Sequence, residues 1–258
     1  MGRIDRLATD ADSYYDALQL GTRITPVHGL QLQVAYTWGK SIDTGSSTIG
    51  GDQYTNSPSS LPVWFDSKTR RSVSDFNLKH NFVVSGLWSV PNLAGNRAKW
   101  ISNGWQVGTV LQVSSGAPFS VLVGGDPLGL GNTDPYQYPD RVAACGSPTH
   151  SGGIQYVNTS CFVAPPAGHL GNAGRNYLSG PGQFNTDLSF YKNTKLSERV
   201  NLQLRAELFN LTNHPNFAPP IDNSTLFNQD GSAVGLAGTL SSTQSPERQL
   251  QFGVRVSF

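Results

Sequence analysis

Charged residues are scarce in this sequence. They make up 14% of the 258 residues, against roughly 25% in ordinary soluble domains. The net charge is +1, so there is no electrostatic basis for binding nucleic acid. Uncharged polar residues take the place of the charges, while aromatic residues reach 10%. This composition suits a surface shared between lipid and water, and it also suits a secreted β-sandwich.

Long hydrophobic runs are also missing. No stretch approaches the ~18–20 apolar residues of a membrane-spanning helix, and the most apolar one, 82–90, is interrupted by Ser85, Gly86 and Ser89. No apolar region follows the charged start 1–6, so a signal peptide is not predicted. If the protein is exported, we expect the export signal to lie outside this chain, which would then be a partial gene product.

Patterns that carry catalysis or bind metals are not found. The five histidines form no HxxxH or HExxH pattern, and Ser114 lies in no nucleophile elbow. The glycines at 124–131 do not join a strand to a helix, as a phosphate cradle requires. Loop carboxylates at Asp126, Asp134 and Asp140 fit solvated side chains better than a calcium site. We therefore predict no enzyme, no catalytic residue, no cofactor and no metal site.

Only two cysteines occur, Cys145 and Cys161. They lie in a segment rich in Gly, Pro, Ser and Asn, and no further Cys or His pair completes a zinc ligand set. Two interpretations stay open. Either a disulfide closes this loop in an oxidising compartment, or the two thiols are unrelated.

Strict alternation of apolar and polar residues is the dominant pattern of the chain. It is cleanest from Leu30 to Trp38, where Leu, Leu, Val, Tyr and Trp occupy every second position. A helix over 11–20 is an alternative for the first segment, but alternation continues past Gly21 and favours a strand. Seven such strands are predicted, at 13–24, 30–39, 75–90, 105–114, 184–191, 200–209 and 248–258. Many exceed the ~5–6 residues usual in soluble proteins and match the ~9–11 needed to cross a bilayer at a tilt.

The connections alternate in length. Short ones follow residues 24, 90 and 191, while long polar ones cover 40–75, 116–183 and 211–246, with a short hairpin expected at 119–123. In an antiparallel meander, alternate connections share one end, so all short turns lie on one side. Outer-membrane barrels have this asymmetry, and a β-sandwich gives no reason for it. The predicted fold is an all-β antiparallel transmembrane meander.

The two faces of the strands differ in charge. Arg205 and Glu207 lie opposite the apolar face of strand 200–209, where Arg at the lipid midplane would cost roughly 2–4 kcal/mol. We therefore predict that Asp187, Arg205, Glu207 and Arg255 face a watery lumen. They either pair with one another in the wall or contact a substrate. Aromatic residues gather near strand ends, as in interfacial girdles.

The last eight residues, 251–258, form an alternating strand that stops on an aromatic residue. Gln251, Gly253, Val256 and Phe258 occupy the four specified places of the C-terminal assembly signal of bacterial outer-membrane barrels, which this octet resembles. That resemblance implies recognition by the barrel-assembly machinery.

Several blocks together resemble the C-terminal part of TonB-dependent receptors, in particular the Oar-like transporters of acidobacterial type. They are 15–19, 35–43, 75–82, 104–107, 115–119, 171–176 and 205–217. The resemblance implies an outer-membrane location, a barrel of the 22-stranded type, contact with lipid, and transport of an unidentified substrate. It also implies energy from the TonB complex, delivered through a plug. Residues 1–258 would then be the C-terminal barrel segment, without the plug and the N-terminal domains.

A second function from another class is a secreted carbohydrate-binding β-sandwich with aromatic side chains as sugar platforms. The one-sided long loops and the terminal Phe258 favour the transporter.

Overall fold

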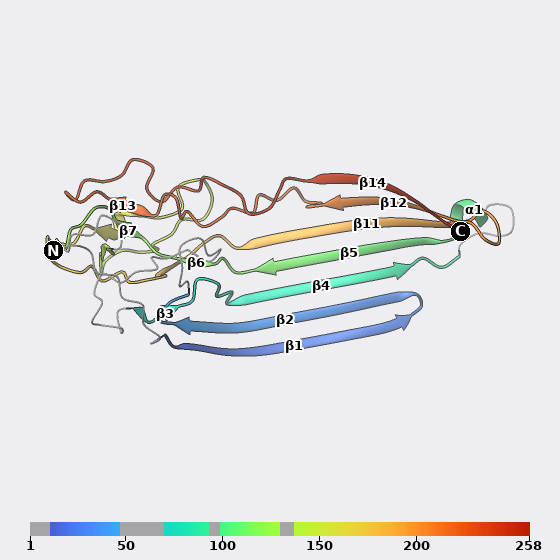
Figure 1. Cartoon of the computed structure of the whole chain (residues 1–258), viewed down its shortest axis with the longest axis horizontal. Coiled ribbons are helices and arrows are strands. Elements are labelled where there is room, and N and C mark those ends of the chain that lie inside the picture. Colours follow the sequence, from blue (N-terminus) through green and yellow to red (C-terminus); the bar gives the residue numbers. More distant parts are fainter. Residues whose placement is uncertain (1–10, 47–69, 93–98, 130–136) are drawn as a thin grey trace.

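Seven long antiparallel strands form one sheet. The computed structural model describes residues 11–46, 70–92, 99–129 and 137–258. Each long strand pairs with the next one along the chain, so the sheet is a meander (Figure 1). The strands are β1 (Ser13–Val27), β2 (Leu30–Asp43), β4 (His80–Ser89), β5 (Trp105–Ser114), β11 (Gln183–Lys195), β12 (Asn201–Phe209) and β14 (Gln249–Ser257). The predicted all-β antiparallel meander is confirmed.

The β1–β2 hairpin shows how the turns set the register. His28 and Gly29 have φ values of 52° and 81°, and positive φ at both central residues defines the type I′ turn that matches strand twist. A Cβ on Gly29 would lie 2.4 Å from the carbonyl oxygen of Ser89, so glycine is required there. The hairpin then pairs continuously from Ile24↔Leu32 to Ser13↔Asp43.

The short and long connections separate to opposite ends of the sheet. The short turns, helix α1 (Lys99–Ser102) and the C-terminus lie at one end, and the long connections lie at the other (Figure 1). This arrangement agrees with the predicted meander. Within the described ranges, no helix is long and apolar enough to cross a membrane.

Several predicted boundaries need correction. The strand predicted from 75 begins at His80, because Asp75 is buried in a polar cluster instead of extending the sheet. Both ends of the loop predicted at 40–75 belong to the sheet, because β2 continues to Asp43 and β3 (Ser72–Val73) pairs with Ile42 and Asp43. Residues 47–69 lie outside the described part. Strand β11 runs to Lys195, so the short connection predicted to follow residue 191 begins later.

The long connections contain secondary structure of their own. Residues 116–129, 137–182 and 211–246, here called the loop cap, contain three small sheets. The hairpin predicted at 119–123 is wrong, because its two halves pair elsewhere. In the small sheets β6 (Pro118–Phe119) pairs with β10 (Leu178–Ser179), β7 (Leu122–Val123) with β13 (Thr225–Phe227), and β8 (Asp140–Arg141) with β9 (Phe162–Val163).

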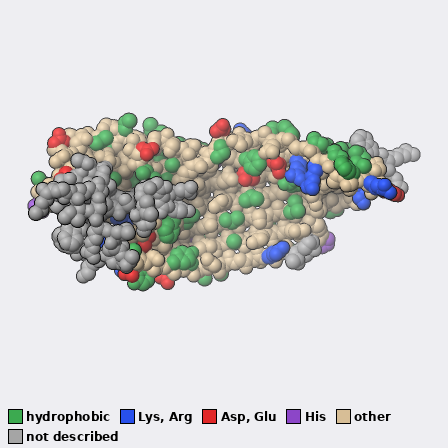
Figure 2. Space-filling model, viewed as in Figure 1, with side chains coloured by type: hydrophobic (Ala, Val, Ile, Leu, Met, Phe, Trp, Pro, Cys, Tyr) green, Lys and Arg blue, Asp and Glu red, His purple; other side chains and the backbone are tan. Residues whose placement is uncertain are grey.

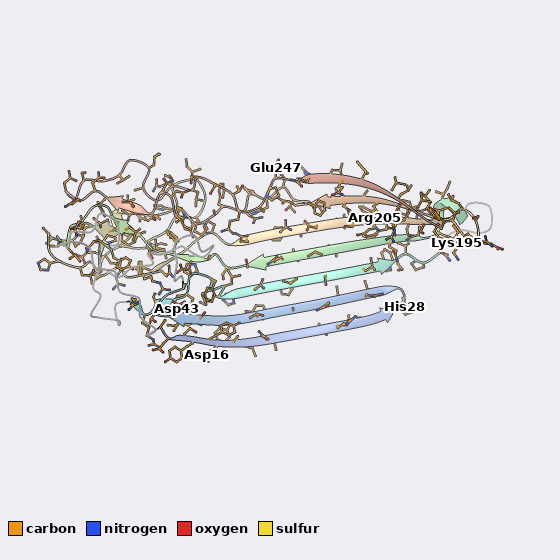
Figure 3. All side chains as sticks on the ribbon, in the orientation of Figure 1. Asp16, His28, Asp43, Lys195, Arg205 and Glu247 are labelled. Carbon is orange, nitrogen blue, oxygen red and sulfur yellow. A yellow bond between two sulfur atoms is a disulfide. The ribbon has the colours of Figure 1, made fainter. Side chains whose placement is uncertain are left out.

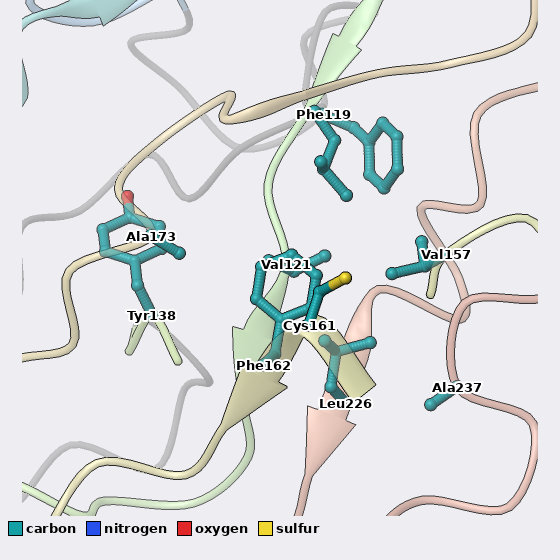
Figure 4. Close-up of a cluster of buried hydrophobic side chains, with 10 residues drawn as sticks. Phe119, Val121, Tyr138, Val157, Cys161, Phe162, Ala173, Leu226 and Ala237 are labelled. Carbon is teal, nitrogen blue, oxygen red and sulfur yellow. The ribbon is translucent and has the colours of Figure 1, made fainter. Parts of the chain in front are cut away.

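The main hydrophobic core lies inside the loop cap, not on the long strands. Phe119, Val121 and Val157 are fully buried there (Figure 4). The apolar residues of the cap follow no period, which is why sequence periodicity could not reveal their packing. The cluster comprises Phe119, Val121, Tyr138, Val157, Cys161, Phe162, Ala173, Leu178, Leu226 and Ala237.

Candidate functional site

One face of the sheet is a continuous apolar surface. Strand pairing sets Leu204 beside Val254 and Ala206 beside Phe252, and similar rows continue across the other strands. Phe252 and Val254 are 73% and 71% exposed, so no described segment covers them. A long strand that leaves such side chains uncovered in water would aggregate. This face is built to contact lipid.

The apolar face ends at polar groups on both sides. Near the short turns, the ammonium of Lys192 donates to the carbonyl oxygen of Asn103 and lies 5.7 Å from the centroid of the Trp105 ring, as a side chain reaching for the interface does. Near the cap, the Tyr36 hydroxyl and His80 Nδ1 are 2.8 Å apart. Between them, residues 30–38 of β2 cover roughly 26 Å at about 3.3 Å per residue, which suits a tilted bilayer crossing.

The opposite face is polar and carries the predicted charges. By register, Glu207 lies beside Ser189 and Gln251, Arg205 beside Tyr191 and Gly253, and Arg255 beside Gln203. Asp187 projects from the same face of the sheet as these residues, from strand β11. In the view of Figure 2, most atoms over the sheet belong to backbone or uncharged polar side chains, and charged side chains are few.

A ladder of side-chain hydrogen bonds crosses four strands on the polar face. Gln106 Nε2 donates to Ser89 Oγ (3.1 Å), and Asn193 Nδ2 donates to Gln106 Oε1 (3.3 Å). Gln203 Nε2 donates to Asn193 Oδ1 (2.8 Å), and Arg205 Nε donates to Gln203 Oε1 (2.6 Å). Amides that satisfy one another in this way line a wet surface while fixing strand alignment.

The predicted charges are not all brought together. The guanidinium of Arg205 lies 5.8 Å from the centroid of the Tyr191 ring, whose hydroxyl donates to Glu207 Oε1 at 3.4 Å. Tyr191 therefore stands between the two charges. Asp187 accepts the backbone N–H of Asn210 (2.9 Å) at the cap end, while Arg255 pairs with Gln203 toward the short turns. It stays a prediction that these residues face a watery lumen, where they either pair with one another or contact a substrate.

A buried polar cluster joins the loop cap to the rim of the sheet. Arg175 forms an ion pair with Asp43, and its side chain and that of Asp43 are 4% and 3% exposed. Asp75 Oδ1 lies 3.6 Å from the same guanidinium nitrogen, and Asn176 Nδ2 donates to Asp75 Oδ1 at 2.6 Å. We call Asp43, Asp75, Arg175 and Asn176 the rim clamp; Asp43 lies at the cap end of β2 (Figure 3).

Burial and charge shift two pKa values near the rim clamp. Burial acts to raise the pKa of Asp43, but hydrogen bonds from Ser46, Arg175 and Ser74, with the charge of Arg175, leave it below its ordinary value. Asp43 lies beyond the apolar band, outside the membrane-spanning part of β2. Burial raises the pKa of Tyr138 to about 12, with Arg175 opposing the rise and Asp75 adding to it.

Sequence reasoning missed the rim clamp as a unit. Asp43, Asp75 and Arg175 each lie in one of the sequence blocks that carried the family resemblance, at 35–43, 75–82 and 171–176. The three residues therefore lay in blocks that the sequence had already singled out. One sequence does not show, however, that the end of a strand and two loop segments meet. Arg175 and Asp43 are separated by 132 positions.

A second group of polar contacts holds the cap end of β11 and β12. Asn216 Oδ1 accepts the backbone N–H of Phe184 (2.8 Å), and its Nδ2 donates to the carbonyl oxygen of Phe184 (2.9 Å). Asn210 Nδ2 donates to the carbonyl oxygens of His214 (3.1 Å) and Pro246 (3.2 Å). These amides act as backbone substitutes, so the block 205–217 folds into a fixed corner.

The structure joins Cys145 and Cys161 in a disulfide, with Cα atoms 5.1 Å apart. The bond lies in the loop cap, where Cys161 belongs to the buried core. No group of three or more His, Cys, Asp or Glu side chains suited to a metal ion occurs among the described residues. Asp134, one of the loop carboxylates considered for calcium, lies outside them.

The closing octet begins in β14, one of the two edge strands of the sheet. Val256 lies on the apolar face, while Gln251 and Gly253 lie on the polar side, beside Glu207 and Arg205. Phe258 follows the end of β14 and is 99% exposed. The C-terminus lies at the same end of the molecule as the short turns (Figure 1).

Comparison with known proteins agrees with this geometry. A search of curated proteins found no match. A family model described as "Outer membrane beta barrel domain" matches residues 1–251. The β-sandwich alternative is wrong, because the long strands make a single sheet, and no described segment packs as a second sheet on its apolar face. With lipid-facing and water-facing side chains alternating along every long strand, the chain belongs to the outer membrane beta barrel domain family and resides in the bacterial outer membrane.

Proposed function

We propose that this chain is the wall and the extracellular loops of a TonB-dependent outer-membrane transporter. The observation that carries the proposal is the division of the molecule into two ends. One end has short turns, and the other has a folded, disulfide-linked cap above a polar sheet face. A barrel that only anchors itself in lipid has no need of so large a folded cap. The resemblance of the sequence blocks to Oar-like receptors supports the same assignment.

The transporter barrel is proposed to contain more strands than these. The outer edges of β1 and β14 pair with no strand among the described residues, and unpaired backbone groups in lipid cost several kcal/mol each, by order of magnitude. Further strands must satisfy these edges. We assign residues 1–258 to the C-terminal part of a 22-stranded barrel whose plug contacts the TonB complex.

In this role the chain acts by binding and admitting a substrate, not by catalysing a reaction. The polar face supplies amides and separated charges. Arg205 and Glu207 are held apart by Tyr191, so the face presents hydrogen-bond donors and acceptors without a reactive pair. We propose that this wall solvates the passage beside the plug.

The closing octet is proposed to bind the barrel-assembly machinery. Its support is the exposure of Phe258 at the end of β14, an edge strand whose outer side pairs with no described strand and can pair with the machinery before the barrel closes. Deleting Phe258 should lower the amount of folded protein in the outer membrane, while Ser257→Ala should not. Equal amounts of both variants, measured by heat-modifiable gel migration, would contradict this role.

Dependence on TonB is the decisive test of the function. A strain lacking the gene that encodes this chain is compared with a TonB-depleted strain for growth on a panel of oligosaccharides, peptides and iron chelates. If deletion of the gene abolishes growth on a nutrient, TonB depletion should abolish growth on the same nutrient. The double mutant should show no additional growth defect. Uptake that disappears with the gene but persists without TonB would exclude the proposal.

A further inference from the structure

A cleft in the loop cap combines an aromatic ring with an arginine that forms no ion pair among the described residues. It is lined by Arg141, Cys145, Cys161, Phe162, Asn172 and Tyr177, among others, and holds about 390 Å³. Ligand sites in proteins usually measure about 300–1,000 Å³. This cleft, here called the Arg141 cleft, is separate from the polar sheet face and from the rim clamp.

The walls of the Arg141 cleft are held in place by covalent and hydrogen bonds. The disulfide joins Cys145 to Cys161 across it, and the Val142 N–H donates to the carbonyl oxygen of Cys161 at 2.9 Å. On the other side, the Asn172 N–H donates to Asp140 Oδ1 at 3.0 Å. A cleft with a fixed shape loses little conformational entropy when a ligand binds.

Arg141 is held in one orientation, and within the described segments no carboxylate compensates its charge. Its Nε and its backbone N–H both donate to Asn172 Oδ1, at 3.3 and 2.9 Å, and its guanidinium carbon lies 5.1 Å from the centroid of the Tyr177 ring. Phe162 supports that ring edge-on, with centroids 6.1 Å apart. No carboxylate forms an ion pair with Arg141 within the described segments, so its terminal N–H groups remain available.

The other polar side chains of the cleft also offer donors. Because Asn172 Oδ1 faces two N–H groups, its amide nitrogen points the other way, and none of its hydrogen bonds in the described structure uses that nitrogen. The Tyr177 hydroxyl, which can donate or accept, likewise has no hydrogen-bond partner in the described structure, and the residue is 39% exposed. Free donors on three neighbouring side chains, with a single charged residue among the lining residues, call for an acceptor-rich anion.

We propose that the Arg141 cleft binds the anionic group of an acidic saccharide. The terminal nitrogens of Arg141 fit a carboxylate or a sulfate in a two-pronged geometry, and the Asn172 amide and the Tyr177 hydroxyl suit the ring hydroxyls beside it. An acidic peptide is less well matched, since β8 and β9 are two residues long and offer no strand edge for a peptide backbone. The inference deepens the proposed transport function and rests on it for the placement of the cleft outside the cell.

Binding is tested with the full-length protein purified in detergent. The probes are trigalacturonate, its neutral methyl ester, sulfated galactotriose and unsulfated galactotriose, titrated by calorimetry. A single charge-assisted contact is worth enough to change affinity roughly ten- to a hundredfold. We therefore expect at least one anionic saccharide to bind at least about tenfold more tightly than its neutral counterpart. The preferred anion identifies a uronate or a sulfate ester as the recognised group.

Variants assign that binding to the cleft. Arg141→Gln should lose the preference for the anion, and Tyr177→Phe should weaken binding by a smaller factor without changing the fold. Arg199→Gln, the same chemical change at an exposed arginine in the β11–β12 turn, is the matched control and should bind like the parent. Heat-modifiable migration confirms folding of each variant.

Three results would overturn the proposal. They are equal binding of the anionic and neutral saccharides, equal affinity of the Arg141→Gln and Arg199→Gln variants, and tighter Arg141-dependent binding of hexaglutamate than of either saccharide. None of them bears on TonB dependence of uptake, which is measured in cells. Failure of the saccharide site and failure of the transport function are therefore distinguishable.

Discussion

Removal of Arg175 should release the loop cap from the sheet while leaving the transmembrane strands folded. Arg175 is 4% exposed in its side chain, and it forms an ion pair with Asp43, donates to the carbonyl oxygen of Arg70 at 3.0 Å and donates to Ser46 Oγ at 2.9 Å. Arg175→Met keeps most of the side-chain volume but leaves the carboxylates of Asp43 and Asp75 buried beside an apolar group.

The expected cost follows from the burial of the two carboxylates. Breaking a buried ion pair by removing one partner costs about 3–5 kcal/mol. At about 1.4 kcal/mol for each factor of ten, the open population of the cap should rise roughly a hundred- to several-thousandfold. The long strands do not depend on Arg175 for their pairing, so opening should stay local.

Limited proteolysis of the purified protein measures this opening. We expect cleavage within the loop cap to accelerate strongly in Arg175→Met, while the heat-modifiable migration of the barrel persists. Arg248→Met is the control, because Arg248 is exposed and its only hydrogen bond in the described structure is through its backbone N–H. Adding Asp43→Asn and Asp75→Asn to Arg175→Met should recover part of the loss, since buried charge is then removed.

Equal cleavage rates in Arg175→Met and Arg248→Met would refute the clamp. Equal rates in the single variant and the triple variant would refute the electrostatic reason given for it. Loss of barrel migration together with cap cleavage would show that cap and sheet form one cooperative unit.

Three further predictions concern pH, the disulfide and the lipid face. The pKa of Asp43 is lowered in the fold, so ionised Asp43 stabilises the cap fully above the ordinary pKa of 3.8, and this stabilisation is lost as the pH falls through the folded pKa. Cleavage of the cap by an acid protease should therefore accelerate as the pH falls below 3.8. The acceleration should be much smaller in Asp43→Asn. Replacing Cys145 and Cys161 by Ser opens a loop spanning sixteen positions and should destabilise the cap by about 3 kcal/mol, whereas an unchanged urea midpoint for cap cleavage would contradict this. Leu111→Arg on the apolar face should cost roughly 2–4 kcal/mol in vesicle unfolding experiments, while Gln112→Arg, one residue along on the polar face, should cost little; similar losses for both would overturn the assignment of the faces.

The transmembrane strands could be predicted from sequence because their environment imposes a period. Lipid on one side and water on the other make every second residue of 30–38 apolar, and this rule needs no knowledge of the partner strand. The turn between the first two strands also has a local cause, because His28 and Gly29 can adopt the positive φ values that a tight hairpin turn requires. The alternation of short and long connections then placed the two kinds of connection at opposite ends of the predicted meander.

The loop cap could not be predicted in the same way. Phe119, Val157 and Leu226 pack together, yet each comes from a stretch with no periodic pattern, because irregular segments bury side chains wherever the fold brings them together. Polar contacts were equally hidden. Arg175 reads as a solvated loop residue until its partners are located.

The sequence alone therefore determined the sheet, its two faces and the membrane setting, since these depend on local alternation against a layered solvent. Only the tertiary structure decided that the long connections form a packed cap, that Arg175 fastens it to Asp43 and Asp75, and that Arg141, Asn172 and Tyr177 meet in one cleft. Such contacts join distant segments through burial and charge pairing, and no local pattern in the chain encodes which segments will meet.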